Sequence, residues 1–400
     1  MTTHRAIVDA LSRASAAGES VVLATVARVT GSSYGGVGAR MLIRVDGSTV
    51  GLVSGGCLES DLAEHARRVH ETDRAEVVRY DTRDDEDAPW GLGLGCNGLI
   101  DVLLEPLQPP RAKYFAKFLS RALDADQPSV LATVIRVAPA GANTSFVDTE
   151  AILGGDSETA GAAPSIGAHA LFTGNRIEKS GEWGSGNTLA SATADSDEAL
   201  TAGRHGLYRE YGPVEVAFEV VAPAVRLVIC GSGPDVIPIA RFGSELGWDV
   251  TVVDHRPVDA SHAARFPGAR VVESAEPSRL ADVVSLTPRT AAVVMSHHIS
   301  RDTDYVGALL DSGAAYIGVL GPRARTERML ADLSGRRGAP VAPGGPLFAP
   351  VGIDIGGEGP DAIGLAIVSE ISAVLNARSA GHLRDKAGPL HGKANLGSHR

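Results

Sequence analysis

The chain of 400 residues has little cysteine and no excess of positive charge. Its three cysteines, Cys57, Cys96 and Cys230, are too few and too scattered for a disulfide framework or a four-thiolate zinc site, so we expect reduced thiols. The formal net charge of −11 argues against a general electrostatic attraction to nucleic acid or anionic lipid. We therefore expect no nucleic-acid partner.

Long hydrophobic runs are also missing. No stretch approaches the roughly 18 apolar residues of a membrane-spanning helix, and the start MTTHRAIVDALSRA has no signal-peptide core followed by a cleavage site. These absences predict a cytoplasmic protein without a membrane span. The apolar content of 44% is enough to fill the cores of two or three domains of roughly 100–200 residues each.

The first part of the chain mixes the periodicities of helices and strands. Helical apolar spacing covers 4–17 and 57–70, β-branched strand-like strings cover 21–29 and 99–107, and a hairpin is expected to turn at Asp46 and Gly47. Prolines follow the last of these strands and interrupt the chain. We predict a mixed α+β domain over 1–108.

The segment 109–222 repeats the opening of that domain. VLATVARV at 22–29 returns as VLATVIRV at 130–137, with seven of eight positions identical, and GARMLIRVDG at 38–47 is echoed by GAHALFTGNR at 167–176. Short β-branched strings also recur by chance, which is the alternative. Because the second copy has no cysteine, we predict a degenerate repeat that is structural, with the chemistry kept in the first copy.

From residue 223 the pattern changes to alternating strands and helices. RLVIC, DVTVVD, TAAVVMS and AAYIGVLG are short apolar runs separated by helical segments such as PIARFGSELG, as in a parallel sheet with helices on both faces. We predict an α/β fold with a Rossmann-like domain over 223–378. The polar, glycine-bearing tail over 379–400 is expected to be disordered.

A glycine turn follows the first of these strands. Gly231 and Gly233 in GSGPDV stand where backbone amides could approach a phosphate, and Asp254 ends the next strand 23 residues after Gly231, where a ribose hydroxyl is held in dinucleotide folds. The third glycine position holds Val236. Two hypotheses remain open, dinucleotide binding and a Rossmann fold retained as a scaffold.

Other candidates follow later strands of the same domain. In SHHISRD, His297 and Asp302 come just after a strand and could relay a proton or bind a metal, although no third metal ligand is fixed by spacing. Gly321 precedes a helix that begins with arginines, and Gly356 lies in a glycine-rich stretch before another helix, so both are candidate anion sites. Solvated loops, ordinary surface charges and helix caps are the alternatives.

The first domain carries three glycine-rich loops, GSSYGGVGAR, SGGCLE and GLGCNG, two of which contain a thiol. Their glycines would let backbone amides and sulfur approach a bulky ligand. Cys57 stands at a predicted helix start, which favours a reactive thiolate, and Cys96 lies in a tighter loop. The alternative is that these cysteines are buried and inert, as free cysteines often are.

Taken together, the motifs resemble those of the XdhC/CoxI family of molybdenum-cofactor maturation proteins. The strings that carry the resemblance run in family order from about residue 22 to residue 376, and 110–222 contributes little. They are GSSYGGVGARMLIRVDG, SGGCLES, GLGCNGLIDVLLEP, VICGSGPD, VTVVDHRP, SHHISRD, YIGVLGPRARTERML and PVGIDIGGEGPDAIGLAIVSEI.

The resemblance implies a cofactor-insertion chaperone rather than an enzyme with turnover. Such a protein would bind molybdenum cofactor (molybdopterin), support the exchange of an oxo ligand for sulfur supplied by a cysteine desulfurase, and deliver the cofactor to a xanthine-dehydrogenase-like or CO-dehydrogenase-like apoenzyme. The candidate catalytic residues are Cys96, Cys57, His297 and Asp302. The candidate cofactor-binding residues are Gly31, Ser32, Gly38, Arg40, Gly55, Gly56, Glu59, Gly231, Gly233, Asp254, Gly321 and Gly356.

Two other functions are compatible with the same residues. One is an NAD(P)-dependent oxidoreductase in which Asp254 holds ribose and His297 acts as acid or base. The other is an interaction scaffold whose Rossmann and thiol sites no longer bind ligands. A homodimer is a further candidate assembly.

Overall fold

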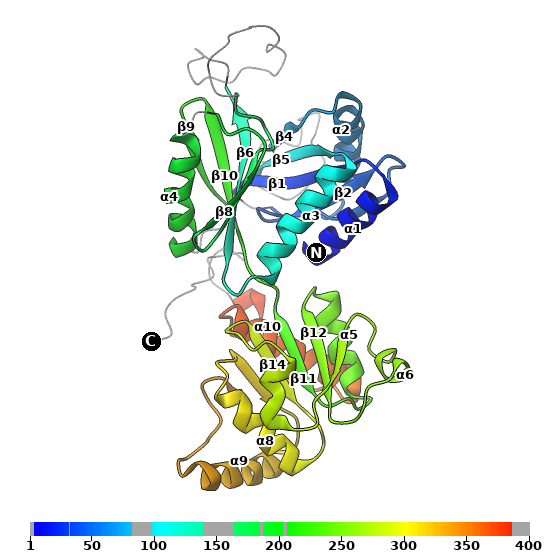
Figure 1. Cartoon of the computed structure of the whole chain (residues 1–400), viewed down its shortest axis with the longest axis vertical. Coiled ribbons are helices and arrows are strands. Elements are labelled where there is room, and N and C mark those ends of the chain that lie inside the picture. Colours follow the sequence, from blue (N-terminus) through cyan, green and yellow to red (C-terminus); the bar gives the residue numbers. More distant parts are fainter. Residues whose placement is uncertain are drawn as a thin grey trace. The chain divides into compact units, whose positions relative to one another are not determined.

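The computed structural model describes residues 4–31, 33–81, 98–138, 163–184, 187–202 and 206–385. The chain divides into two compact units, Met1–Pro223 and Ala224–Arg400. The first boundary expected from the sequence, at 108, falls inside the first unit, which holds two similar sheets (Figure 1).

Two copies of one arrangement of helices and strands make up the first unit. The first copy consists of α1 (His4–Ala17), β1 (Val21–Gly31), β2 (Arg40–Arg44), β3 (Thr49–Gly51), α2 (Glu59–Thr72), β4 (Glu76–Asp81) and β5 (Gly98–Leu107). The second consists of α3 (Pro109–Asp124), β6 (Ser129–Val137), β7 (His169–Thr173), β8 (Arg176–Ser180), α4 (Asn187–Ala202), β9 (Leu207–Tyr211) and β10 (Val214–Val221).

Strand order shows the duplication directly. The antiparallel sheets have the orders β3-β2-β1-β5-β4 and β8-β7-β6-β10-β9, so each strand of one has a counterpart in the other. The copies also share a contact, because a tyrosine of the fourth strand donates to an aspartate of the second helix in both: Tyr80 to Asp61 and Tyr211 to Asp195, each at 2.5 Å. The echoed strings at 22–29 and 130–137 are therefore counterpart strands, β1 and β6.

Each copy has its own core, and the copies also contact one another. Apolar side chains of β1, β2 and β5 pack against α2, and those of β6, β7 and β10 pack against α4. Between the copies lies a smaller apolar cluster of Ala27, Leu103, Ile135 and Ala217. Since these four are counterpart positions on β1, β5, β6 and β10, the same face of each sheet is buried against the other copy.

The second unit is a parallel sheet in the order β13-β12-β11-β14-β15-β16. Numbered within the unit this is 3-2-1-4-5-6, the order of dinucleotide-binding Rossmann folds, so the predicted α/β class is confirmed. Its strands are β11 (Arg226–Cys230), β12 (Asp249–Asp254), β13 (Arg270–Glu273), β14 (Thr290–Val294), β15 (Tyr316–Val319) and β16 (Leu347–Phe348).

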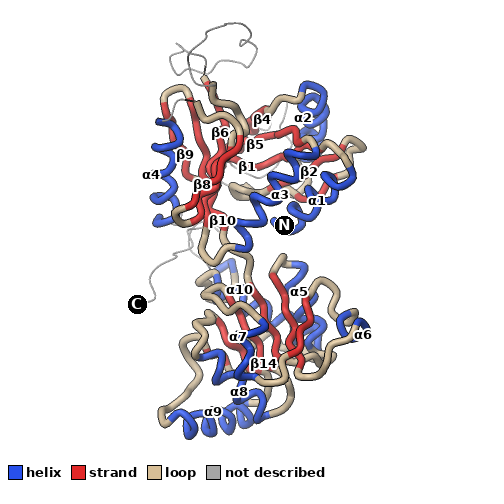
Figure 2. Tube along the Cα trace, in the orientation of Figure 1, coloured by secondary structure: helices blue, strands red, loops and turns tan. Residues whose placement is uncertain are grey.

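Helices cover both faces of this sheet (Figure 2). The helices are α5 (Val236–Glu245), α6 (Ala260–Ala263), α7 (Leu280–Val283), α8 (Ile299–Leu310), α9 (Arg323–Arg337) and α10 (Pro360–Leu375), with short 3-10 turns at Pro277–Arg279 and Leu383–Asp385. Side chains alternate along β11, so Leu227 and Ile229 face α5 and α10 while Val228 and Cys230 face α8 and α9. The chain order reverses between β11 and β14, and it is at the carboxyl ends of such strands that folds of this kind have their ligand crevice.

The buried centre of the second unit predicts a large effect of a single truncation. Ile317 of β15 is fully buried, whereas Ile355 is 44% exposed in a loop. We expect Ile317→Ala to lower the free energy of unfolding by about 2–5 kcal/mol, through lost burial and the cavity left behind. The same change at Ile355 should stay within about 0.5 kcal/mol. Urea unfolding of both variants measures this, and equal losses would contradict the assigned core.

Candidate functional site

The loop that carries Cys57 is held in place by the carboxylate of Glu59, the first residue of α2. Its Oε1 accepts from the amides of Val53 (3.2 Å) and Ser54 (2.8 Å), and its Oε2 accepts from the amides of Gly56 (2.9 Å) and Leu58 (3.1 Å) and from the Ser54 hydroxyl (2.5 Å). A carboxylate at a helix start also complements the helix dipole. Both oxygens are thus engaged by the loop of residues 53–58 itself, so Glu59 supports that loop.

Among the described residues of the first unit, Cys57 carries an exposed thiol. It follows Gly55 and Gly56, whose φ angles of 82° and 112° lie in the left-handed region that glycine tolerates. The chain therefore turns sharply just before the helix and leaves the thiol open to a ligand.

A second glycine-rich loop, residues 33–38, packs directly on this one. A Cβ added to Gly55 would lie 3.2 Å from ring atoms of Tyr34, and a Cβ added to Gly35 would lie 2.2 Å from the carbonyl oxygen of Val53. The backbone contact excludes a side chain at Gly35, and a side chain at Gly55 would press on the ring of Tyr34. Any displacement of loop 33–38 should consequently reach the segment that presents Cys57.

Other residues expected to bind a cofactor in this unit have different surroundings. Gly31 ends β1 with φ 83°. Arg40 turns into the interior, is 3% exposed and pairs with Glu219 of β10, and Gly38 lies against the same glutamate. Ser32 and Cys96 lie outside the described residues.

The glycine turn of the second unit lies at the crevice between β11 and β14. Gly231 has φ 135°, and a Cβ there would lie 2.5 Å from the carbonyl oxygen of Met295. The close approach of the loops after β11 and β14 therefore accounts for this glycine without a ligand. Val236, the departure from the third glycine, is fully buried in the core beside the sheet.

Sequence reasoning missed the functional candidate Asp235. Its Oδ2 lies 2.9 Å from Nε2 of His297, which has φ 62°, an uncommon backbone conformation for a residue other than glycine. Its Oδ1 is buried without a hydrogen-bond partner among the described residues, and a Cβ on Gly233 would lie 2.4 Å from it. A carboxylate thus lies against the glycine turn, where phosphate-binding turns receive their anion. The available clue was an acidic residue inside the GSGPD turn.

Asp254 is engaged at the end of β12. It accepts from the Ser232 hydroxyl and from the amide (3.0 Å) and guanidinium (2.9 Å) of Arg256, and it is 3% exposed. Burial alone would raise the pKa of Asp254, but the hydrogen bonds from Arg256 and Ser232 outweigh it and hold the pKa well below its usual value. A ribose hydroxyl would have to share this carboxylate with Ser232 and Arg256.

Asp302, the second proton-relay candidate, is fully buried. It accepts from the amide (3.0 Å) and hydroxyl (2.5 Å) of Ser296 and from the guanidinium of Arg325 (2.6 Å). It thereby joins the loop after β14 to the start of α9. Gly321 precedes Arg325 with φ 143°, and Gly356 has φ 66° with open space where a Cβ would be.

Some of the candidates form two groups, one in each unit. The first group is the thiol loop with loop 33–38, and the second is the crevice around Gly231, Gly233 and His297. Cys230 belongs to neither, since it is buried in the sheet, where burial raises the pKa of its thiol. Within the described residues, no three His, Cys, Asp or Glu side chains are grouped to hold a metal ion. No helix in the same residues has the length and apolar character needed to cross a membrane.

The hydrogen bonds of Glu59 predict a pH-dependent loop. Burial raises the pKa of Glu59, but the hydrogen bonds from the Ser54 hydroxyl and amide outweigh it, so the pKa lies below its ordinary value. The carboxylate's contribution to loop order is then fully present above the ordinary pKa and is lost as the pH falls through the lowered value. Amide protection factors of residues 53–58, measured by hydrogen exchange over a pH series, should fall in acid.

Substitutions separate this effect from general acid loosening. Glu59→Gln should lower the protection of loop 53–58 at neutral pH and remove most of its pH dependence. Glu64→Gln, at an exposed carboxylate of the same helix, should change neither. Protection that stays constant into acid in the unmodified chain would show that Glu59 does not hold the loop.

Comparison with known proteins gives consistent matches along the chain. A family model described as the XdhC Rossmann domain matches residues 227–371, and one described as the XdhC and CoxI family matches residues 14–81. A protein of Bacillus subtilis (strain 168), described as a probable subunit of xanthine dehydrogenase, is 29% identical over 353 residues, which cover 88% of this chain and 92% of that protein.

Two further matches bear on the fold and the relatives. The molybdenum cofactor insertion chaperone PaoD of Escherichia coli (strain K12) is 34% identical over 106 residues, covering 26% of this chain and 32% of that protein. A crystal structure of a protein from Bacillus halodurans, described as a xanthine dehydrogenase, aligns with a TM-score of 0.69 and 28% identity over 96% of this chain and 98% of the other. With both family models matched in order and both units aligned to one solved structure, the chain belongs to the XdhC/CoxI family.

Proposed function

We propose that this protein binds molybdenum cofactor as its cargo and assists the maturation of a molybdenum hydroxylase. The observation that carries the proposal is the exposed thiol of Cys57, set after two glycines on a loop that Glu59 holds. A thiolate is a soft ligand suited to a soft metal centre, and glycine turns leave backbone amides open to a phosphate group. The name of the matched chaperone PaoD, molybdenum cofactor insertion chaperone, supports the same role.

The arrangement suits a carrier better than a resident metalloenzyme. Within the described residues one exposed thiol, rather than a closed set of ligands, is offered to a metal, and a carrier must release what it binds. We propose a xanthine-dehydrogenase-like or CO-dehydrogenase-like apoenzyme as the recipient. We further propose that the cofactor is sulfurated while bound, with a cysteine desulfurase as sulfur donor, and that Cys96 acts with Cys57.

Loss of the thiol should reduce retention of the cargo. We expect the protein from a cofactor-producing host to release a fluorescent pterin after acid oxidation, and Cys57→Ala to lower the yield by about tenfold or more, equivalent to ~1.4 kcal/mol of binding. Cys230→Ala removes a buried thiol and is the matched control, which should retain the pterin. No pterin in the unmodified chain, or equal yields from the two variants, would refute the proposal.

The crevice of the second unit supports a second candidate function. The strand order is that of NAD(P)-binding folds and the turn keeps two of their three glycines, which would fit an oxidoreductase with His297 as acid or base. Against it, the Asp235 carboxylate lies on the turn and Asp254 is already engaged. We therefore propose that this unit serves the maturation role without binding NAD(P).

Asp235 provides the test between these functions. Because a carboxylate beside the turn repels a pyrophosphate, we expect little binding of NADH or NADPH to the unmodified chain and about tenfold tighter binding to Asp235→Ala. Asp304→Ala, which removes an exposed carboxylate from α8, should leave binding unchanged. Fluorescence titration decides: tight binding by the unmodified chain, weakened in Asp235→Ala, would favour the oxidoreductase.

Absence of both bound pterin and bound dinucleotide, with retained binding to a hydroxylase, would favour an interaction scaffold.

A further inference from the structure

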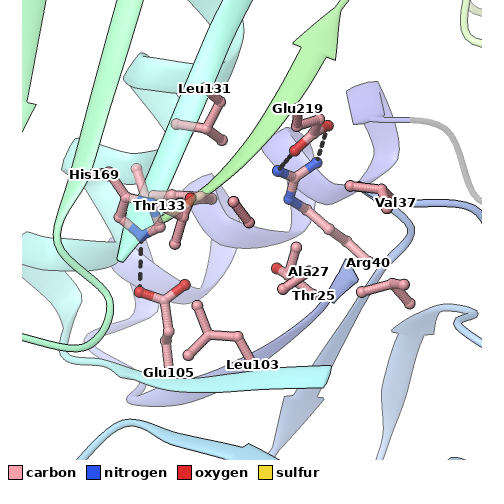
Figure 3. A pocket seen from close by; sticks show the side chains of 13 residues that line it. Thr25, Ala27, Val37, Arg40, Leu103, Glu105, Leu131, Thr133, His169 and Glu219 are labelled. Carbon is pink, nitrogen blue, oxygen red and sulfur yellow. Dashed lines mark hydrogen bonds and ion pairs between the residues drawn. The ribbon is translucent and has the colours of Figure 1, made fainter. Parts of the chain in front are cut away.

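Two buried glutamates of the first unit each pair with a side chain of the other copy (Figure 3). Arg40, the first residue of β2, donates from its two terminal nitrogens to Glu219 of β10, at 3.0 and 2.5 Å. His169, the first residue of β7, has its Nε2 2.8 Å from Oε1 of Glu105 on β5. Each pair joins one copy to the other.

The strand registers show that these pairs are counterparts. Thr25 lies opposite Arg40, as Thr133 lies opposite His169. Leu23 lies opposite Glu105, as Leu131 lies opposite Glu219. All four side chains are buried and line one cavity between the copies, so each carboxylate depends on the partner that the other copy supplies.

Each carboxylate also lies against a counterpart glycine that precedes the paired strand. A Cβ on Gly38 would lie 2.3 Å from Oε1 of Glu219, and a Cβ on Gly167 would lie 2.7 Å from Oε1 of Glu105. Gly38 has φ 87° and Gly167 has φ 79°. Each glutamate therefore bears directly on the end of the loop that leads into the other copy's second strand.

In the first copy this contact continues to the thiol loop. Arg40 donates from Nη1 to the carbonyl oxygen of Gly38 at 3.0 Å while holding Glu219, so the carboxylate, the guanidinium and the loop end form one assembly. Loop 33–38 then contacts the segment before Cys57 through Tyr34 and Gly35. A continuous series of contacts thus runs from β10 of the second copy to the exposed thiol of the first.

The two pairs are not equally strong. Arg40 satisfies both oxygens of Glu219, whereas His169 reaches one oxygen of Glu105 and leaves Oε2 buried without a hydrogen-bond partner among the described residues. Bidentate guanidinium–carboxylate pairs add geometric specificity as well as energy. The tighter clamp therefore acts on the loop that lies beside Cys57.

We propose that Glu219 is a positioning residue: from the second copy, it sets loop 33–38 through Arg40 and Gly38 and thereby holds the Cys57 loop in its binding geometry. The second copy is thus a working part of the thiol site, although it carries no thiol. The binding step of this proposal rests on the proposed function, but the ordering of the loop does not.

The test uses the duplication as its own control. In the full chain, Glu219→Gln should quicken amide exchange of residues 35–39 by about tenfold or more, while exchange of residues 165–168 changes by no more than about twofold. Glu105→Gln should quicken exchange of residues 165–168 and leave residues 35–39 within about twofold. Mass-spectrometric mapping should show a changed rate of Cys57 alkylation in Glu219→Gln only. Glu219→Asp, which keeps the charge, should restore part of the protection, as a general loss of stability would not.

A second pair of variants covers the case in which Glu219→Gln fails to fold. Gly38→Ala brings a methyl group against Glu219 and should change Cys57 alkylation, whereas Gly167→Ala should leave it unchanged. Equal effects of the two glutamate variants on both loops, or of the two glycine variants on Cys57, would overturn the proposal. Pterin retention is measured separately. If Glu219→Gln changes amide exchange of residues 35–39 only, but the unmodified chain holds no pterin, the proposed cargo is rejected and the positioning role of Glu219 remains supported.

Discussion

The ion pair between Arg40 and Glu219 is buried, so neither charge can be left without the other when the first unit folds. Removing one partner of such a pair is costly because an uncompensated charge stays in the interior. Burial alone would raise the pKa of Glu219, but Arg40 and then His4 outweigh it and keep that pKa far below its ordinary value. The pair joins β10 of one sheet to the start of β2 of the other and lies against Gly38 at the end of the loop before β2.

The second unit has the fold of dinucleotide-binding proteins, but its own side chains disfavour a dinucleotide. Its strand order is that of dinucleotide-binding proteins and its turn keeps two of their three glycines, yet Asp235 places negative charge on the turn and pairs with His297. The backbone of His297 stays in an uncommon conformation, and such conformations persist only where the surroundings fix them. The crevice is therefore organised around an internal carboxylate.

Local patterns in the sequence were sufficient for several elements of the first copy and for the parallel α/β character of the second unit. The hairpin at Gly47, the helix after Cys57 and the buried strands of the parallel sheet all follow from turn chemistry and from periodicity. The pairing of Glu219 with Arg40 could not be predicted in this way, because 179 residues separate the two side chains and nothing local marks them as partners. Glu59 was predicted from the sequence as a cofactor-binding residue, but its hydrogen bonds to the loop of residues 53–58 depend on backbone geometry that the sequence does not show.

Duplication followed by exchange has a consequence for the history of the chain. Arg40 of the first copy contacts Glu219 of the second, and their counterparts, His169 of the second copy and Glu105 of the first, make the same contact in the other direction. Contacts exchanged in this way have the form of a twofold-symmetric dimer. A single-copy ancestor would present the same carboxylate, the same apolar strip and the same strand start, and a second identical molecule would satisfy all three. Within one polypeptide the two halves need not stay identical, and the chain has a histidine at position 169 where the counterpart position 40 has an arginine.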